Sequence, residues 1–247
     1  MKWRQLVVGL VLTLITWQVL AWLIGRPILP PPGPVLVTFW AELWGGDLGR
    51  HFAVSVWRVL AGIGLATVLA VPAGLALGQS QRLNALFSPL IYIAYPVPKV
   101  VLLPIFLLLL GIGDLSKIVL IATILFFQVL VVVRDEASTI RPELIMSVRS
   151  LGAGRLAVLR FVYLPASIPA MLTALRLSIG TAVAVLFLTE SFATTEGLGY
   201  YIMVENWGRV AYREMYAGVI AMSLLGVALY YFTDWLERRL APWLHVA

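Results

Sequence analysis

The chain has 247 residues, of which 61% are hydrophobic and only 12% are charged, and its formal net charge is +6. A soluble domain contains about 25% charged residues, so the composition excludes the soluble classes and indicates an integral membrane protein. The absence of cysteine rules out disulfides and thiolate metal sites. The two histidines, His51 and His245, lie far apart in sequence, so no metal-ligand spacing is present and we expect no metal site.

Six apolar runs are long enough to cross a bilayer, whose hydrocarbon core of about 30 Å takes roughly 20 helical residues. They cover residues 5–25, 53–78, 86–111, 117–133, 166–190 and 215–234. We interpret the first run as an anchor, because its apolar stretch exceeds the core of a cleavable signal peptide. The fold class expected is all-α: a polytopic transmembrane bundle of about six helices, with residues 1–247 forming a single transmembrane domain.

The distribution of Lys and Arg sets the orientation, because cytoplasmic loops carry the excess of these residues. If the N-terminus is cytoplasmic, ten basic residues lie inside: Lys2, Arg4, Arg82, Arg134, Arg141, Arg149, Arg155, Arg160, Arg238 and Arg239. Five then lie outside: Arg26, Arg50, Lys117, Arg209 and Arg213. We therefore expect both termini and the polar loop 134–165 to be cytoplasmic. This topology accounts for the net charge, so no nucleic-acid partner is expected.

Prolines interrupt the chain at two places. The run of prolines in residues 27–34 favours a stiff outer spacer, followed by a short surface helix through Trp40 and Trp44 that ends at Gly45–Gly46. The tryptophans are more typical of interfacial anchors than of a ligand cage. Within the third run, the prolines at 96, 98 and 104 predict a bent or broken helix. Such breaks occur where a helix meets protein or water, so runs three and five are candidates for lining a path.

The loop 134–165 is the one long polar interruption, and it holds five of the arginines. Pro142 and Glu143 favour the start of a short helix that runs to about residue 151. Gly152 and Gly154 permit a sharp reversal, and a second short helix over 155–163 is expected to stop before Leu164-Pro165. The loop is then a compact knob that docks a partner. An ordinary positive-inside loop is the alternative interpretation.

The end of this loop resembles a known signature. Gly152, nine further residues and then Val162-x-Leu164-Pro165 are similar to the loop of binding-protein-dependent ABC importer permeases. The family's Glu-Ala-Ala positions hold Met146-Ser147-Val148 here, so Glu143 or Arg149 would supply the polar contact to the ATPase. The resemblance implies an ATPase-coupling loop made of Glu143, Met146, Arg149, Ser150, Leu151, Gly152, Ala153, Gly154, Arg155, Leu164 and Pro165.

Other motifs resemble the sulfonate, taurine and nitrate branch of these permeases. They are His51-x3-Ser55-x2-Arg58-x3-Gly62, the segment 111–117 (GIGDLSK), Leu175-Arg176, and Glu190 followed by Gly197-Leu198-Gly199-Tyr200. No single motif decides the matter, but their order and spacing together do, because a chance match would have to occur in five separate segments.

The resemblance implies a type I importer permease in the bacterial inner membrane. Its expected partners are a second copy of itself, two cytosolic ABC ATPases, an extracytoplasmic solute-binding protein and the lipid bilayer. The chain has no Gly-x4-Gly-Lys-Ser/Thr loop, so we expect no enzyme activity and no cofactor of its own; ATP and Mg²⁺ would bind the partner ATPases. The subunit would move a small solute by alternating access.

Three ionisable residues lie within or at the end of apolar runs, where charges are costly and often functional. Lys99, Arg176 and Glu190 are therefore candidates for the translocation path, and a cation there favours an anionic solute. The alternative is structural: Arg176 and Glu190 hold helix to helix, and Lys99 extends toward the interface.

Other functions stay open on the sequence. A secondary transporter would show inverted repeats and paired intramembrane charges, and no convincing repeat is present. A membrane-embedded enzyme would need a clustered acid, base, nucleophile or metal site. An ABC importer permease for a different solute class is the remaining alternative.

Overall fold

The computed structural model describes residues 3–192 and 194–244, all of whose regular elements are helical. Lys2 and His245 lie outside the described residues. The α-helices are α1 (Trp3–Ile24), α2 (Pro32–Gly45), α3 (Leu48–Gln79), α4 (Gln81–Ala94), α5 (Leu103–Leu110), α6 (Asp114–Thr139), α7 (Pro142–Ser150), α8 (Arg155–Val158), α9 (Leu164–Glu190), α10 (Leu198–Tyr200) and α11 (Tyr212–Leu240). Four shorter segments complete them: the 3₁₀ turns Lys99–Leu102 and Pro242–Leu244, and the π turns Leu159–Tyr163 and Tyr201–Asn206.

Among the described residues, five helical stretches are long and apolar enough to span a membrane, and a bent pair makes a sixth if it counts as one span. The five are Val7–Ile24, Leu48–Gln79, Asp114–Thr139, Arg155–Glu190 and Tyr212–Leu240. This result confirms the all-α, multi-pass architecture expected from the apolar runs.

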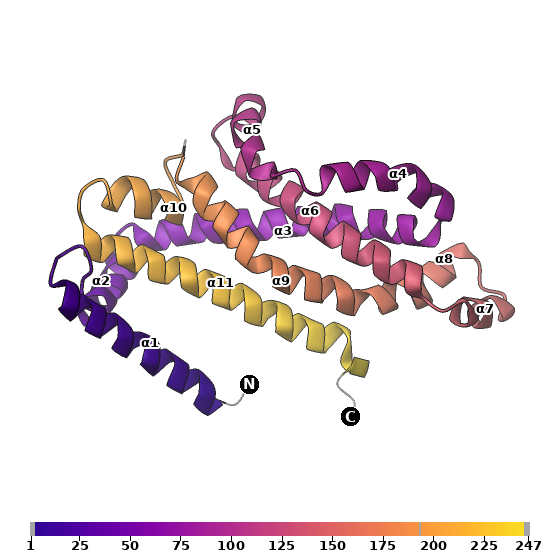
Figure 1. Ribbon diagram of the computed structural model, residues 1–247, viewed down its shortest axis with the longest axis horizontal. Coiled ribbons are helices and arrows are strands. Elements are labelled where there is room, and N and C mark those ends of the chain that lie inside the picture. The colour runs from indigo at the N-terminus through magenta and orange to yellow at the C-terminus, as the bar shows by residue number, and fades with distance from the viewer. Residues whose placement is uncertain (1–2, 193, 245–247) are drawn as a thin grey trace. The chain divides into compact units, whose positions relative to one another are not determined.

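The third apolar run is broken at its prolines. Gln81–Ala94 and Lys99–Leu110 meet at a bend of 81°, and residues 95–98 between them are non-helical. Pro96 and Pro98 lack the amide protons that a continuing helix needs there. The predicted interruption is therefore confirmed. Figure 1 shows α4 running beside the C-terminal half of α3 before the chain turns into α5.

The predicted surface helix is α2. It begins at Pro32, where a proline's missing amide proton costs nothing in the first turn, and it ends at Gly45 with Gly46 as its cap. Trp40 and Trp44 are both exposed, Trp44 by 81%.

The chain divides into two compact units. The first contains Met1–Val56 and Phe187–Leu224, and the second contains Trp57–Leu186 and Leu225–Ala247. The division falls inside α3, α9 and α11. The core of the second unit is an apolar cluster of α3, α4, α6 and the start of the 155–190 helix: Ala70, Leu75, Leu77, Ile91, Val129, Leu130, Val133, Ala137, Val158, Val162 and Tyr163.

The expected stop before Leu164-Pro165 is wrong. The helix that begins at Arg155 continues to Glu190 as one stretch, and Leu164 itself has α-helical φ and ψ of −63° and −51°. The π turn at Leu159–Tyr163 explains the difference, because wider hydrogen bonds there re-register the backbone just before the proline.

The polar loop also begins later than its sequence indicated. Helix α6 extends to Thr139, beyond the predicted end of the fourth run at 133. Arg134 is therefore a buried helical residue, whose guanidinium donates to the Asp135 carboxylate at 2.8 and 2.9 Å and lies over the Tyr92 ring. Four of the five loop arginines remain exposed: Arg141, Arg149, Arg155 and Arg160.

Candidate functional site

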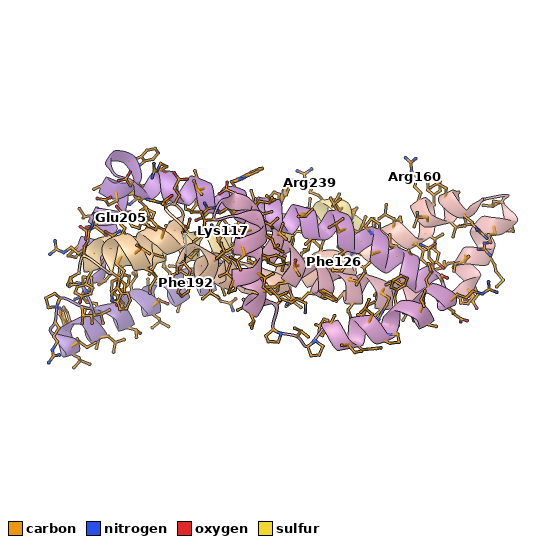
Figure 2. The ribbon with its side chains drawn as sticks, turned by 90° about the horizontal axis from the view of Figure 1, so that it is seen from above. Lys117, Phe126, Arg160, Phe192, Glu205 and Arg239 are labelled. Atoms are coloured by element: carbon orange, nitrogen blue, oxygen red, sulfur yellow. The ribbon has the colours of Figure 1, made fainter. Side chains whose placement is uncertain are left out.

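Helices α7 and α8 project from one end of the second unit. Figure 1 shows them beyond the C-terminal end of α6 and the N-terminal end of α9, and Figure 2 labels Arg160 at the same end. Helix α7 contains no buried residue. Exposed apolar side chains nevertheless sit on it and around it, including Met146, Leu151 and Leu156, and Leu151 is 86% exposed. Apolar side chains grouped with arginines on a projecting element are typical of a surface that another protein covers.

Gly152 provides the elbow between the two helices. Its φ is +81°, in the left-handed region that L-residues with a Cβ avoid. Its amide donates to the Arg149 carbonyl at 2.9 Å and closes the end of α7. No atom lies within 4 Å of a Cβ built on it, so the backbone angle, rather than space, requires glycine. Gly154 has φ −75° and does not use this freedom.

The predicted coupling residues lie together at this end of the chain. Nine are exposed: Glu143, Met146, Arg149, Ser150, Leu151, Gly152, Gly154, Arg155 and Leu164. Ala153 and Pro165 are half-buried. The surface therefore combines basic and apolar groups from α7, the elbow and α8.

Lys99 lies at the break between α4 and α5, where it is 9% exposed. Its ammonium donates to the carbonyl oxygens of Ala94, Tyr95 and Val97 at 2.8, 3.0 and 3.2 Å. It also lies 4.4 Å from the centre of the Phe127 ring. The three N–H groups thus donate to carbonyls at the helix break, of which the Ala94 carbonyl also accepts from the Val97 amide at 3.3 Å.

Arg176 ties two helices of the second unit together. Its Nη1 contacts Asp234 Oδ1 at 3.0 Å and Glu237 Oε2 at 2.9 Å, both on α11. Part-buried pairs of this kind fix helix register, since removing one partner leaves the other charge exposed to a medium of low dielectric constant.

Glu190, which is fully buried, holds the loop that follows α9. Its Oε2 accepts hydrogen bonds from Ser55 Oγ at 2.7 Å and from the Gly199 amide at 3.1 Å. Ser55 Oγ in turn accepts from the Leu198 amide at 2.8 Å. Within the first unit, the start of α3 is therefore hydrogen-bonded to the segment that opens α10.

His51 extends this network. The Gly197 amide donates to His51 Nδ1 at 3.0 Å, so the ring proton lies on Nε2, which faces Glu205 Oε2 at 3.4 Å. Gly197 has φ +109°, and a Cβ on it would overlap the Glu190 carboxylate. Sequence reasoning singled out these motifs without pairing them, because the two segments lie about 140 residues apart.

Two further features of the described residues bear on the chemistry. They contain no group of three or more His, Cys, Asp or Glu side chains that could hold a metal ion.

In the first unit, Tyr201 donates to Glu42 Oε2 at 3.3 Å. Burial, together with the charge of Glu42, raises the pKa of the Tyr201 phenol and keeps it protonated.

Residues 62–246 match the family described as binding-protein-dependent transport system inner membrane component. The chain belongs to this family. The match includes the α7–α8 surface, α9 and α11.

Curated relatives extend the likeness over nearly the whole permease. This chain is 32% identical over 259 aligned residues to the taurine transport system permease protein TauC of Escherichia coli (strain K12). The alignment covers 98% of this chain and 94% of the relative. This chain is also 30% identical over 230 residues to SsuC of Bacillus subtilis (strain 168), a protein named for aliphatic sulfonates transport. That alignment covers 92% of this chain and 83% of the relative.

The fold has a counterpart among solved structures. A chain from inward-facing conformations of the MetNI methionine ABC transporter matches with a TM-score of 0.65 at 19% identity, over 81% of this permease and 97% of that chain. The match confirms the expected fold, that of a type I importer permease.

Proposed function

We propose that this permease is the membrane subunit of an importer that carries small organic sulfonates into a bacterial cell. The single observation that carries the proposal is the exposed α7–α8 surface, placed in a chain whose relatives are named for taurine and aliphatic sulfonates transport. In this proposal the subunit sits in the inner membrane with both termini cytoplasmic, and it catalyses no reaction itself.

The α7–α8 surface is the proposed ATPase contact. Its exposed leucines and methionine would fill an apolar groove, while Arg149 and Arg155 would meet acidic or polar groups at the rim. Two cytosolic ATPase subunits would bind ATP and Mg²⁺, and an extracytoplasmic binding protein would deliver the solute. Two copies of the permease would form the pathway. Dimerisation of the two ATPase subunits would shift these two copies between outward-open and inward-open states.

Each of the predicted path residues, Lys99, Arg176 and Glu190, has protein partners. Their charges would act on a passing solute only through the field they create.

Substitution of the elbow tests the ATPase contact. Gly152→Val forces a β-branched residue into a left-handed backbone conformation, at a cost of about 1–3 kcal/mol. We expect the elbow to change shape and solute transported per ATP hydrolysed to fall roughly tenfold in proteoliposomes, while the subunit still inserts.

Gly113→Val is the matched control, because Gly113 lies outside the coupling loop and has an ordinary φ of −72° with no atom within 4 Å of an added Cβ. It should keep nearly normal coupling. Equal coupling in the two variants would reduce the loop to a topological signal and contradict the ATPase contact.

A further inference from the structure

A cavity of about 570 Å³ lies wholly within the first unit, where the C-terminal end of α1 meets the N-terminal end of α11. Its lining comes from the end of α1, from the proline spacer that follows and from residues 210–214. Ligand pockets enclose about 300–1,000 Å³, so the cavity has room for a polar group larger than a water molecule or an ion. None of the residues with a proposed transport or coupling role lines it.

One wall of the cavity is fixed by Trp17 of α1. Its indole N–H donates to the Pro30 carbonyl at 3.0 Å, and its ring centre lies 5.8 Å from that of Tyr216 on α11. These two contacts join α1, the spacer and α11. The prolines at 27, 30 and 31 all line the cavity, and each fixes its own backbone angle φ. This wall therefore needs little reordering when a ligand binds.

A second wall contains a strained residue. Val210 has a φ of +61°, which is an outlier for a β-branched residue. Its amide donates to the Trp207 carbonyl at 3.1 Å, and the amide of Ala211 donates to the Asn206 carbonyl at 2.9 Å. Strain of this kind persists where the surrounding structure over-determines the backbone, and it clusters at ligand sites. Here it lies at the wall of the cavity, which both Val210 and Ala211 line.

The lining carries a net positive charge. Arg26 and Arg213 contribute two guanidinium groups, and Glu214 contributes one carboxylate. Ion pairs among the described residues of the first unit use other cations: Arg50, His51 and Arg209. Both cavity arginines are exposed. A guanidinium that pairs with no protein carboxylate is suited to a phosphate group, which can accept two of its N–H groups at once.

The depth of the cavity points to a lipid. The Val7–Ile24 span ends two residues before Arg26, and the Tyr212–Leu240 span begins one residue before Arg213. The cavity therefore lies where two apolar spans end, which is the level of the lipid headgroups. Trp22, in the last turn of α1, is 72% exposed, and tryptophan is enriched at this level of a membrane.

We propose that this cavity binds the headgroup of an anionic phospholipid. Arg26 and Arg213 hold its phosphate, and its acyl chains lie along the exposed apolar face of α1. A glycerol headgroup also offers hydroxyl donors to the Glu214 carboxylate, so phosphatidylglycerol fits the lining best. On the proposed orientation this lipid belongs to the outer leaflet. The site goes beyond the proposed function and does not depend on the solute that is transported.

Native mass spectrometry of the purified, delipidated permease–ATPase complex tests the site without solute or binding protein. The probes are phosphatidylglycerol, phosphatidylcholine with the same acyl chains, and glycerol phosphate. We expect phosphatidylglycerol to bind about fivefold tighter than phosphatidylcholine, because the two lipids differ by one unit of charge beside a basic lining. Glycerol phosphate should not bind at concentrations that saturate the site with lipid, since it lacks the apolar chains.

Arg26→Gln and Arg213→Gln should each lower the affinity for phosphatidylglycerol about fivefold, the factor that one basic residue near a headgroup contributes. Arg26→Lys keeps the charge and should retain most of the affinity. Arg50→Gln is the matched control, because Arg50 is an exposed cation of the same unit that pairs with Glu196 at 3.6 Å and does not line the cavity. It should leave the affinity unchanged. ATPase activity of each variant complex reports that it has assembled.

Four results would overturn the proposal. Equal affinities for the two lipids would remove the role of charge, and an unchanged affinity in both Arg26→Gln and Arg213→Gln would place the lipid elsewhere. Glycerol phosphate that binds as tightly as the lipid would make the cavity a site for a free phosphate ester. Weaker stimulation of the ATPase by the binding protein in these variants, at unchanged lipid affinity, would assign the two arginines to an acidic partner protein.

Discussion

Two cations of the second unit, the buried Lys99 and the half-buried Arg176, have different kinds of partner, and the difference determines what each can do. Lys99 donates to backbone carbonyls at a helix break, whereas Arg176 pairs with two carboxylates on α11. A carbonyl cap leaves the positive charge without a counter-ion, so its field remains available to a solute. A doubly paired guanidinium is neutralised locally, and its main contribution is to join two helices.

Lys99→Ala is expected to destabilise the permease as well as slow its transport. The substitution removes the Lys99 donor from the carbonyls of Tyr95 and Val97, while the Ala94 carbonyl keeps the Val97 amide, and each lost hydrogen bond to a charged group costs about 1.5–3 kcal/mol at most. We expect a lower melting temperature for the detergent-solubilised complex, with partial recovery in Lys99→Arg. Arg82→Ala, which removes an exposed cation from α4, should leave the melting temperature nearly unchanged. Slower transport at wild-type stability would mean that Lys99 acts in the path alone.

At single residues, the sequence predicted where polar groups are costly but not which partners they find. The intramembrane positions of Lys99 and Arg176 follow from the apolar runs around them. The partner of Arg176 lies 58 residues further along the chain, and those of Lys99 exist only because the proline break frees carbonyls. The αL position of Gly152 was predictable because the turn is local.

Glycines set the distance between α3 and α6 in the second unit. A Cβ on Gly62 would lie 2.7 Å from the Ile121 side chain, and one on Gly78 would lie 2.6 Å from the Arg134 carbonyl oxygen. Small residues at such positions let helix backbones approach closely, and in a membrane van der Waals packing rather than the hydrophobic effect drives helix association. Residues of α3 and α6 form much of the apolar cluster of the second unit, and the inner side chains of the α7–α8 segment pack against that cluster.

Gly78→Val should therefore weaken the packing of α3 on α6. The new side chain overlaps backbone atoms of α6, which cannot move away as a side chain would, and overpacking of this kind costs about 1–3 kcal/mol or more. We expect a lower melting temperature and a smaller monodisperse fraction in size-exclusion chromatography. Gly64→Val controls for the helix propensity of valine, since a Cβ on Gly64 meets no atom within 4 Å. Similar losses in both variants would contradict close packing at Gly78.

Helix types followed from the sequence better than helix ends did. The break at residues 95–98 was predictable because proline acts on its own turn. The sequence placed the C-terminal end of α6 too early and predicted a stop inside the 155–190 helix. The two errors have a shared reason: local polarity and a proline indicated helix ends, but tertiary packing stabilises helical backbone beyond them. Arg134 continues α6 because Asp135 and the Tyr92 ring accommodate its charge. Pro165 continues the second helix because a π turn precedes it.

For the molecule as a whole, much apolar surface lies outside the packed interior. Only 6% of the residues of Val7–Ile24 are buried, compared with 50% of an apolar 18-residue window within Asp114–Thr139. Exposed apolar helices of this length must be covered by lipid or by protein. Helix α1 is then the span with most of its surface left for lipid or a second copy, whereas α6 is an interior span of the second unit.

Single cysteines test the orientation of the whole molecule, and the natural absence of cysteine makes each variant free of background labelling. Cysteines replacing Ser147 and Gly154 should react with an impermeant thiol reagent only from the cytoplasmic side. Since Arg134 is buried in α6, the four exposed arginines of the α7–α8 segment supply the retention signal. Gly45→Cys, at the exposed end of α2, should react only from the opposite side. Labelling of Ser147→Cys from outside would invert the topology and remove the α7–α8 surface from reach of a cytosolic ATPase.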